Sequence, residues 1–234
     1  MGDALRLLTF VPVGVDRPAV SRATLVFFPV VGLLIGVCWA LPGVFFGQQL
    51  PSAGITAALV LLVDAVVTRG RHLDAVADVA DGAASGRRGD EGIAIMRDPT
   101  IGAIGAAALI LMCLLRYGAL TFASEFPFRL LAAPVVGRAA MVLLIIWLPL
   151  LQDGSVAHQL QRPSRWVVAA AGVVSVAAVV PSGSRGITAL AAGLVVAVVY
   201  GAWLRGRFGE MGRDGVGAGC LIAETAALVV LSTN

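Results

Sequence analysis

Three aspartates with helical spacing are the residues of this sequence best suited to chemistry. Asp74, Asp78 and Asp81 follow one another at intervals of four and three residues in the run RHLDAVADVADG. On an α-helix this spacing places the three carboxylates within about 60° of one another on one face. Such carboxylates repel each other unless a cation lies between them, and their oxygens are ligands that Mg²⁺ prefers. This acidic stripe predicts a divalent-cation site suited to phosphate chemistry, and a solvated acidic helix face is the structural alternative.

Further candidates follow the acidic stripe in the sequence. Gly82 directly after Asp81 is expected to allow a tight chain reversal into the loop GAASGRRGDEG. Asp98, in IMRDPTIGAIG, is the natural fourth carboxylate, or else it caps a helix that begins at Pro99. Gly102 and Gly105 indicate a close approach of another backbone. Positive charge for an anionic substrate would come from Arg87, Arg88 and Arg97.

Membrane helices must position these residues, because the chain is too apolar for a water-soluble fold. Of its 234 residues 59% are hydrophobic and only 13% are charged, whereas a soluble domain is about one quarter charged. One crossing of the bilayer needs about 20 apolar residues, and seven apolar runs approach that length: 25–46, 52–68, 101–122, 131–151, 166–180, 186–204 and 216–232. The sequence predicts an all-α fold, a polytopic integral membrane bundle of about seven transmembrane helices. It would form one membrane domain, 1–234, with a cytoplasmic catalytic segment at about 69–100.

The arginines give an orientation for this bundle. The chain has no lysine, and positively charged residues near helix ends concentrate on the cytoplasmic side. With the amino terminus in the cytoplasm, 13 arginines fall inside, namely Arg6, Arg17, Arg22, Arg69, Arg71, Arg87, Arg88, Arg97, Arg162, Arg165, Arg205, Arg207 and Arg213, and only Arg129 and Arg185 fall outside. The net charge of +3 is therefore attributed to membrane orientation, and no nucleic-acid partner is expected.

Charged residues inside the apolar runs are costly and so are functional candidates. Arg138 is expected to pair with a carboxylate or with a phosphate, and both remain open. Arg116 is expected to snorkel to the far surface. Asp64 precedes Asp74 by ten residues and, on one continuous helix, would lie more than two turns deeper.

Three further polar residues complete the candidates. Asp214 stands at the start of the last run, where it would cap a helix, and Glu224 lies at least two turns further along. His72 points away from the acidic stripe on an unbroken helix, so its partner is expected on another helix.

The order of these motifs resembles a known family. HLDAVADVADG followed by IMRDPTIGAIG, with FFPVVGLLIG, VVGRAAM and GRDGVGA elsewhere, resembles the cobalamin synthase family, the adenosylcobinamide-GDP ribazoletransferases. The resemblance implies a multi-pass enzyme of the bacterial inner membrane. It would join adenosylcobinamide-GDP to α-ribazole, give adenosylcobalamin and release GMP, with Mg²⁺ as cofactor. The carboxylates of the stripe would also accept Mn²⁺ in its place.

The resemblance and the residue chemistry together give a predicted site. The catalytic and metal-binding residues are expected to be Asp74, Asp78, Asp81 and Asp98. The substrate-binding residues are expected to be His72, Arg87, Arg88, Arg97, Arg138, Asp214 and Glu224. Two alternatives are a CDP-alcohol phosphotransferase, suggested by Asp78 to Gly82, and a cation transporter with a carboxylate stripe. The sequence leaves the oligomeric state open, a homo-oligomer included.

Overall fold

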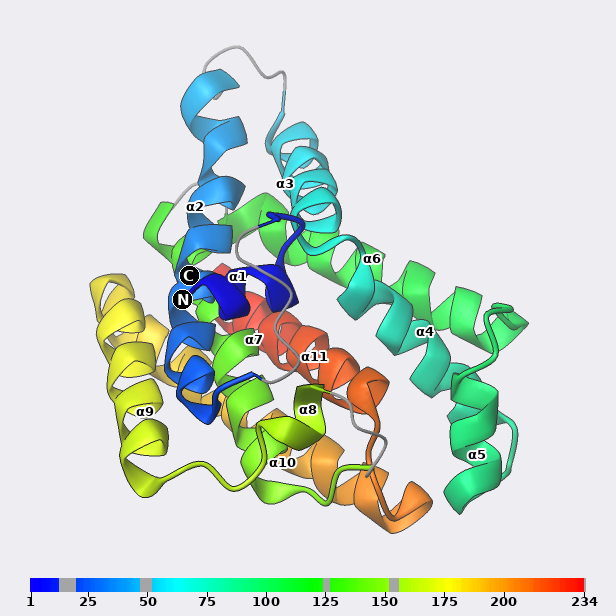
Figure 1. The fold of residues 1–234 in the computed structure, drawn as a ribbon. Coiled ribbons are helices and arrows are strands. Elements are labelled where there is room, and N and C mark those ends of the chain that lie inside the picture. Colours follow the sequence, from blue (N-terminus) through cyan, green and yellow to red (C-terminus); the bar gives the residue numbers. More distant parts are fainter. Residues whose placement is uncertain (13–19, 47–51, 124–126, 152–155, 234) are drawn as a thin grey trace.

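The computed structural model describes residues 1–12, 20–46, 52–123, 127–151 and 156–233, which are almost entirely helical (Figure 1). Within these ranges the β-type pairing is confined to one isolated bridge between Leu150 and Met211, so the all-α prediction is confirmed. The α-helices are α1 (Gly2–Leu8), α2 (Phe28–Phe46), α3 (Ala53–Thr68), α4 (Arg71–Ala84), α5 (Gly89–Met96), α6 (Ala103–Ala123), α7 (Pro127–Trp147), α8 (Val156–Gln159), α9 (Arg165–Val179), α10 (Gly183–Phe208) and α11 (Arg213–Ser232), with short 3₁₀ segments η1 (Arg22–Phe27) and η2 (Val180–Ser182).

The apolar helices agree with the predicted membrane bundle. Five helical stretches of the described chain are long and apolar enough to span a membrane, or six if the bent pair α3–α4 is included. One of the five, Arg165–Phe208, has 44 residues, about twice the length that one crossing needs, and it is interrupted by η2. Counted as two crossings, together with α3, it gives the seven expected from the sequence.

Helices α7 and α11 form the centre of the bundle. In both, 72% of the most apolar 18-residue window is buried, compared with 22% in α6. Helix α7 packs against α2, α10 and α11, and α11 also packs against α4 and α6 (Figure 1). Large apolar side chains cover the outer surface, among them Leu111, Phe122 and Val199. A water-soluble protein rarely exposes such a continuous apolar surface, so lipid is its natural surrounding.

Helix α3 ends in a sharp bend that the sequence did not predict. The axes of α3 and α4 differ by 88°, with Arg69 at φ 58° and Gly70 at φ 64°. The amide of Gly70 donates to the carbonyl of Ala65 at 2.8 Å and that of Arg69 to Val66 at 3.2 Å, the pattern of a Schellman helix end. The continuous helix expected through Asp64 and Asp74 is therefore wrong, and α4 turns away from the axis of α3.

The helix ends separate into two groups, as the arginine distribution predicted. Side-chain to backbone hydrogen bonds join segments predicted to be cytoplasmic, namely Arg71 to Leu7 and Arg207 to Ala83. Other such bonds join segments predicted to be outside, namely Ser182 to Phe128 and Arg129 to Leu231. Arg17 lies outside the described residues. The grouping agrees with the predicted topology, and the cytoplasmic position of the amino terminus stays a prediction.

Candidate active site

Helix α4 carries the acidic stripe on one face. Asp74 is exposed, and Asp78 and Asp81 are half-buried. The opposite face of α4 is apolar and buried, with Ala75 and Val79 exposed by only 3% and 6%. Helix α4 packs against α11, where Ala75 lies beside Gly217, and against α6, which meets Asp81 and the carbonyl of Ala77. The helical stripe predicted from the spacing is present, and packing of the opposite face fixes the direction in which the carboxylates point.

Asp81 holds the beginning of α6. Its two carboxylate oxygens accept hydrogen bonds from the backbone amides of Gly102 and Gly105, both at 2.7 Å. These amides lie at a helix start, where donors lack partners within the helix and a carboxylate is favourable. A Cβ atom on Gly105 would clash with an oxygen of Asp81. The close approach of another backbone is confirmed at Gly105, where the carbonyl oxygen of Ala77 lies near, whereas at Gly102 the approaching group is the carboxylate of Asp81.

Replacing Gly105 with alanine is therefore expected to displace Asp81. The added methyl group would force the carboxylate away and disrupt both hydrogen bonds, which we expect to cost about 1–3 kcal/mol of stability. Gly118→Ala on the same helix is the matched control, because a Cβ there meets nothing within 4 Å and alanine favours helix by about 1 kcal/mol. Thermal unfolding in detergent measures both, and equal unfolding temperatures for the two variants would contradict the proposed contact.

Asp78, Asp81 and Asp98 line one cavity of about 250 Å³, together with Ile95, Thr100 and Gly102. We call it the acidic cavity. Oδ1 of Asp98 accepts hydrogen bonds from the hydroxyl and, at 2.9 Å, the amide of Thr100, and these bonds lower the pKa of Asp98. Helix α6 begins at Ala103, so Asp98 caps the turn before the helix and lines the cavity as well.

The surroundings of Asp78 disfavour its ionised form. Burial raises its pKa to about 6, and the negative charges of Asp74, Asp214 and Asp81 add to the shift, while Arg213 opposes it. Ionised Asp78 therefore destabilises the protein when no cation is near it.

This pKa predicts a pH-dependent effect of Asp78→Asn on stability. Because the folded pKa exceeds that of the unfolded chain, ionisation of Asp78 reduces stability as the pH rises from about 4 to above 6. In chelator, the variant should unfold at a higher temperature than the original protein at pH 7.5, and the difference should shrink through pH 6 and vanish below about pH 4. A difference that is independent of pH would contradict the account.

The acidic cavity has the donor chemistry of a divalent-cation site, but its ligands are not assembled. Hard carboxylate oxygens that repel one another fit Mg²⁺ or Mn²⁺. Within the described ranges, however, no three His, Cys, Asp or Glu side chains are close enough to hold a metal ion. Both oxygens of Asp81 already accept amide hydrogen bonds, and Asp74 faces a different cavity. The four-carboxylate ligand set therefore stays a prediction.

The loop expected after Asp81 is shorter than predicted. Gly82 lies inside α4 with Met96 packed against it, so the chain reversal expected at this glycine is wrong. The reversal follows at residues 85–88, and α5 then occupies Gly89–Met96. Of the three arginines predicted to bind substrate, Arg87 pairs with Glu91 at 3.0 Å. Arg88 and Arg97 are exposed at the two ends of α5.

His72, Asp74 and Asp214 meet at a second cavity. It has a volume of about 500 Å³ and lies between α1, α4, α7 and α11. His72 is buried beside Gly217 of α11, so the prediction that it faces another helix is confirmed. Burial, with the positive charges of Arg138, Arg116 and Arg71, lowers the pKa of His72, so it is neutral at pH 7.

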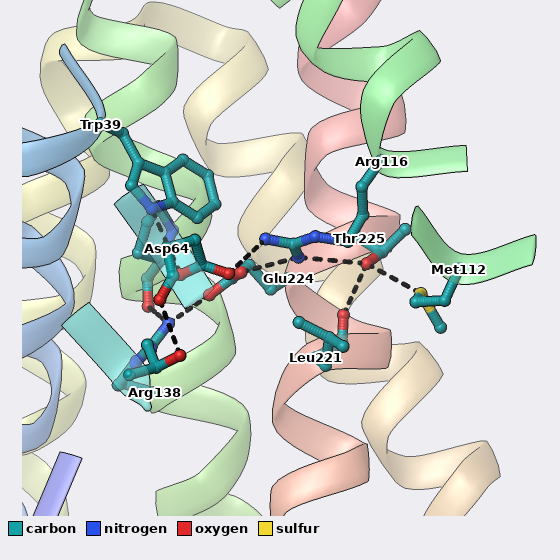
Figure 2. Close-up of polar contacts among 10 residues, drawn as sticks. Trp39, Asp64, Met112, Arg116, Arg138, Leu221, Glu224 and Thr225 are labelled. Atoms are coloured by element: carbon teal, nitrogen blue, oxygen red, sulfur yellow. Dashed lines mark hydrogen bonds and ion pairs between the residues drawn. The ribbon is translucent and has the colours of Figure 1, made fainter. Parts of the chain in front are cut away.

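Four buried charges form a network within the bundle (Figure 2). Arg116 of α6 forms ion pairs with Asp64 of α3 at 2.9 Å and with Glu224 of α11 at 2.8 Å. Arg138 of α7 also pairs with Glu224. Trp39 donates to Asp64 at 3.3 Å and lies beneath the guanidinium of Arg116. None of the four charged residues is exposed by more than 4%, and the two positive and two negative charges balance. We call these residues the buried quartet.

The buried quartet corrects one prediction and narrows another. The expectation that Arg116 snorkels is wrong, because it pairs with two carboxylates and lies over an aromatic ring inside the bundle. Of the two partners left open for Arg138, the structure contains the carboxylate. Arg138 and Glu224 line neither of the two cavities, and their predicted contact with substrate is untested. The sequence did hold a signal for the quartet, since the charges within the apolar runs sum to zero.

Known proteins resemble this chain over almost its whole length. A family model described as cobalamin-5-phosphate synthase matches residues 2–232. Two relatives, each named adenosylcobinamide-GDP ribazoletransferase, are 34% identical to the chain. The match to the protein of Roseiflexus sp. (strain RS-1) covers 100% of this chain and 89% of the relative. The match to the protein of Ectopseudomonas mendocina (strain ymp) covers 99% of this chain and 97% of the relative. A protein of the same name from Chlorobaculum parvum is 36% identical over 97% of this chain and 92% of its own. No solved structure matches significantly. A match over nearly the whole length, with the acidic stripe in place, shows that the chain belongs to the cobalamin-5-phosphate synthase family.

Proposed function

We propose that this protein is a membrane-embedded transferase that joins adenosylcobinamide-GDP to α-ribazole, forming adenosylcobalamin and GMP. The observation that carries the proposal is the full-length family match together with three carboxylates around one cavity at the end of the bundle. The multi-pass helical fold and the family support a place in the bacterial inner membrane. The protein would carry out this function as a monomer or as a homo-oligomer.

In this proposal, the acidic cavity holds the diphosphate of adenosylcobinamide-GDP. The residues that would bind a divalent cation are Asp78, Asp81 and Asp98, with Asp74 next to them on α4. Mg²⁺ or Mn²⁺ bound there would neutralise diphosphate charge, which otherwise repels carboxylates. The exposed Arg88 and Arg97 at the two ends of α5, which do not line the cavity themselves, would supply positive charge for the guanosine-side phosphate.

The transfer itself is a substitution at phosphorus. A hydroxyl oxygen of α-ribazole forms a bond to the cobinamide-side phosphorus, and the bond from that phosphorus to the bridging oxygen breaks, so that GMP leaves with the bridging oxygen. The hydroxyl proton passes to a carboxylate of the stripe and then to water. Such transfers depend mainly on positioning and on neutralising charge, and the packed face of α4 gives the stripe a fixed direction.

The direct test is turnover by purified protein in proteoliposomes. With adenosylcobinamide-GDP and α-ribazole we expect release of GMP and formation of a cobamide, both abolished by chelator and restored by Mg²⁺. Because the family description refers to a cobalamin 5-phosphate, α-ribazole 5′-phosphate is assayed in parallel. Phospholipid formation from a CDP-activated donor would instead indicate the CDP-alcohol phosphotransferase alternative, and ion flux without nucleotide would indicate a transporter.

A further inference from the structure

The second cavity joins an apolar wall to a polar one. Its apolar wall consists of side chains that are almost completely buried, among them Leu8, Phe28, Ile145, Leu160 and Val216. Its polar wall contains exposed Arg71, Asp74 and Arg213. Small-molecule sites have this character, an apolar concavity with a few polar groups, and volumes of about 300–1,000 Å³. The cavity of about 500 Å³ has the size and lining of a binding site for a small organic molecule.

The amino-terminal helix forms one wall of this cavity. Leu7 and Leu8 of α1 are part of its lining. The guanidinium of Arg71 donates to the carbonyl of Leu7 at 2.8 Å, and that of Arg69 donates to the carbonyl of Phe10 at 2.9 Å. Arg71, the first residue of α4, and Arg69, in the bend before it, therefore hold α1 and the residues after it in place beside the helix that carries the acidic stripe.

The charges of the two cavities differ in a way that distinguishes their ligands. The acidic cavity is lined by three carboxylates and no basic residue, which suits a cation together with a diphosphate. In the second cavity the two basic residues Arg71 and Arg213 stand against the two acidic residues Asp74 and Asp214, so these four charges balance. A neutral molecule with an apolar ring and hydroxyl groups matches this lining, and a large corrinoid exceeds its volume.

The position of the second cavity fits the acceptor of the reaction. Asp74 lines it, whereas Asp78, one helical turn further along α4, lines the acidic cavity. A hydroxyl group held beside Asp74 would thus lie next to the site proposed for the diphosphate. Transfer between two bound substrates requires such neighbouring sites.

We propose that the second cavity is the acceptor site, which binds the aromatic nucleoside with its base against Ile145, Leu160 and Phe28 and its sugar hydroxyls toward Asp74 and Asp214. This proposal rests on the proposed function. The transferase activity alone does not specify where the nucleoside base binds, or that α1 forms part of its binding site.

The test fills the cavity from α7 with Met141→Trp, since Met141 is part of its lining. We expect KM for α-ribazole to rise about tenfold or more, the size of effect that one misfitted group produces in an apolar pocket, with KM for adenosylcobinamide-GDP within about twofold. The matched control is Leu111→Trp, on the lipid-facing surface of α6 with 66% exposure, for which neither KM should change. Equal KM values for α-ribazole in the two variants would overturn the acceptor site.

A second variant keeps the test decisive if Met141→Trp does not fold. Met141→Ala enlarges the cavity. It should raise kcat/KM for a benzimidazole riboside with bulkier ring substituents, relative to kcat/KM for α-ribazole, by about tenfold compared with the original protein. An unchanged ratio would contradict the proposal. Failure of the transferase function is distinguishable, because the original protein would then release no GMP with any riboside, whereas failure of the acceptor site alone leaves its turnover intact.

Discussion

Asp78→Asn is expected to lower kcat for GMP release at least about 100-fold while leaving the fold intact. Asp78 lines the acidic cavity, and asparagine keeps its shape but removes the negative charge that a cation needs. Replacing a residue that only supports a metal ligand lowers metal affinity or activity about 10–100-fold. Replacing a ligand itself should lower activity further. Asp78 is a cleaner target than Asp81, since Asp81 also accepts the amides of Gly102 and Gly105 and its replacement would disturb α6.

Asp90→Asn is the matched control for this experiment. Asp90 is exposed in the first turn of α5, does not line the acidic cavity, and loses the same charge in the same chemical change. Its kcat should stay within about twofold of the original value, as expected for a surface substitution away from the site. Full activity in Asp78→Asn, or equal losses in both variants, would contradict a catalytic role for the stripe.

Glu224→Gln is expected to lower stability by about 3–5 kcal/mol, because it leaves two buried guanidinium groups with a single carboxylate. Glu224 is 1% exposed and bonds both Arg116 and Arg138. Since domains are stable by only about 5–15 kcal/mol, this loss should lower both the unfolding temperature in detergent and the amount of protein in membranes. Glu210→Gln, at an exposed position before α11, is the control and should change stability by no more than about 0.5 kcal/mol.

A double variant separates charge balance from packing. Glu224→Gln combined with Arg138→Met restores neutrality, because Asp64 and Arg116 keep their pair at 2.9 Å. It should recover at least half of the lost unfolding temperature, since an uncompensated buried charge costs more than a missing pair. A double variant less stable than Glu224→Gln alone would show that packing of Arg138, and not its charge, explains the quartet.

The local features of this fold could be predicted from the sequence. The acidic stripe follows from the spacing of Asp74, Asp78 and Asp81 on one helix, and the close contact with α6 follows from Gly102 and Gly105. The apolar runs and the arginines near their ends predict the membrane bundle, because the bilayer sets the length and the apolar composition of every helix that crosses it. These features depend on residues close in sequence or on the membrane as a whole.

Features that depend on distant contacts could not be predicted. The 88° bend at Arg69 and Gly70 interrupts a run whose periodicity reads as one helix, and one glycine is a weak signal for a helix end. Arg116 meets Asp64 and Glu224 across 52 and 108 residues of chain, so helix packing alone decides its partners. The separation of Asp74 from Asp78 and Asp81 into two cavities likewise arises only when α4 lies between α6 and α11.

Direct binding of Mn²⁺, measured by electron paramagnetic resonance on purified protein in lipid nanodiscs, tests the central claim most directly. Without substrate at pH 7.5, the original protein and Asp90→Asn should bind Mn²⁺ that Mg²⁺ displaces, and Asp78→Asn should lose this binding. Equal stoichiometry and affinity in Asp78→Asn and Asp90→Asn would contradict the claim that the acidic stripe of α4 is the divalent-cation site.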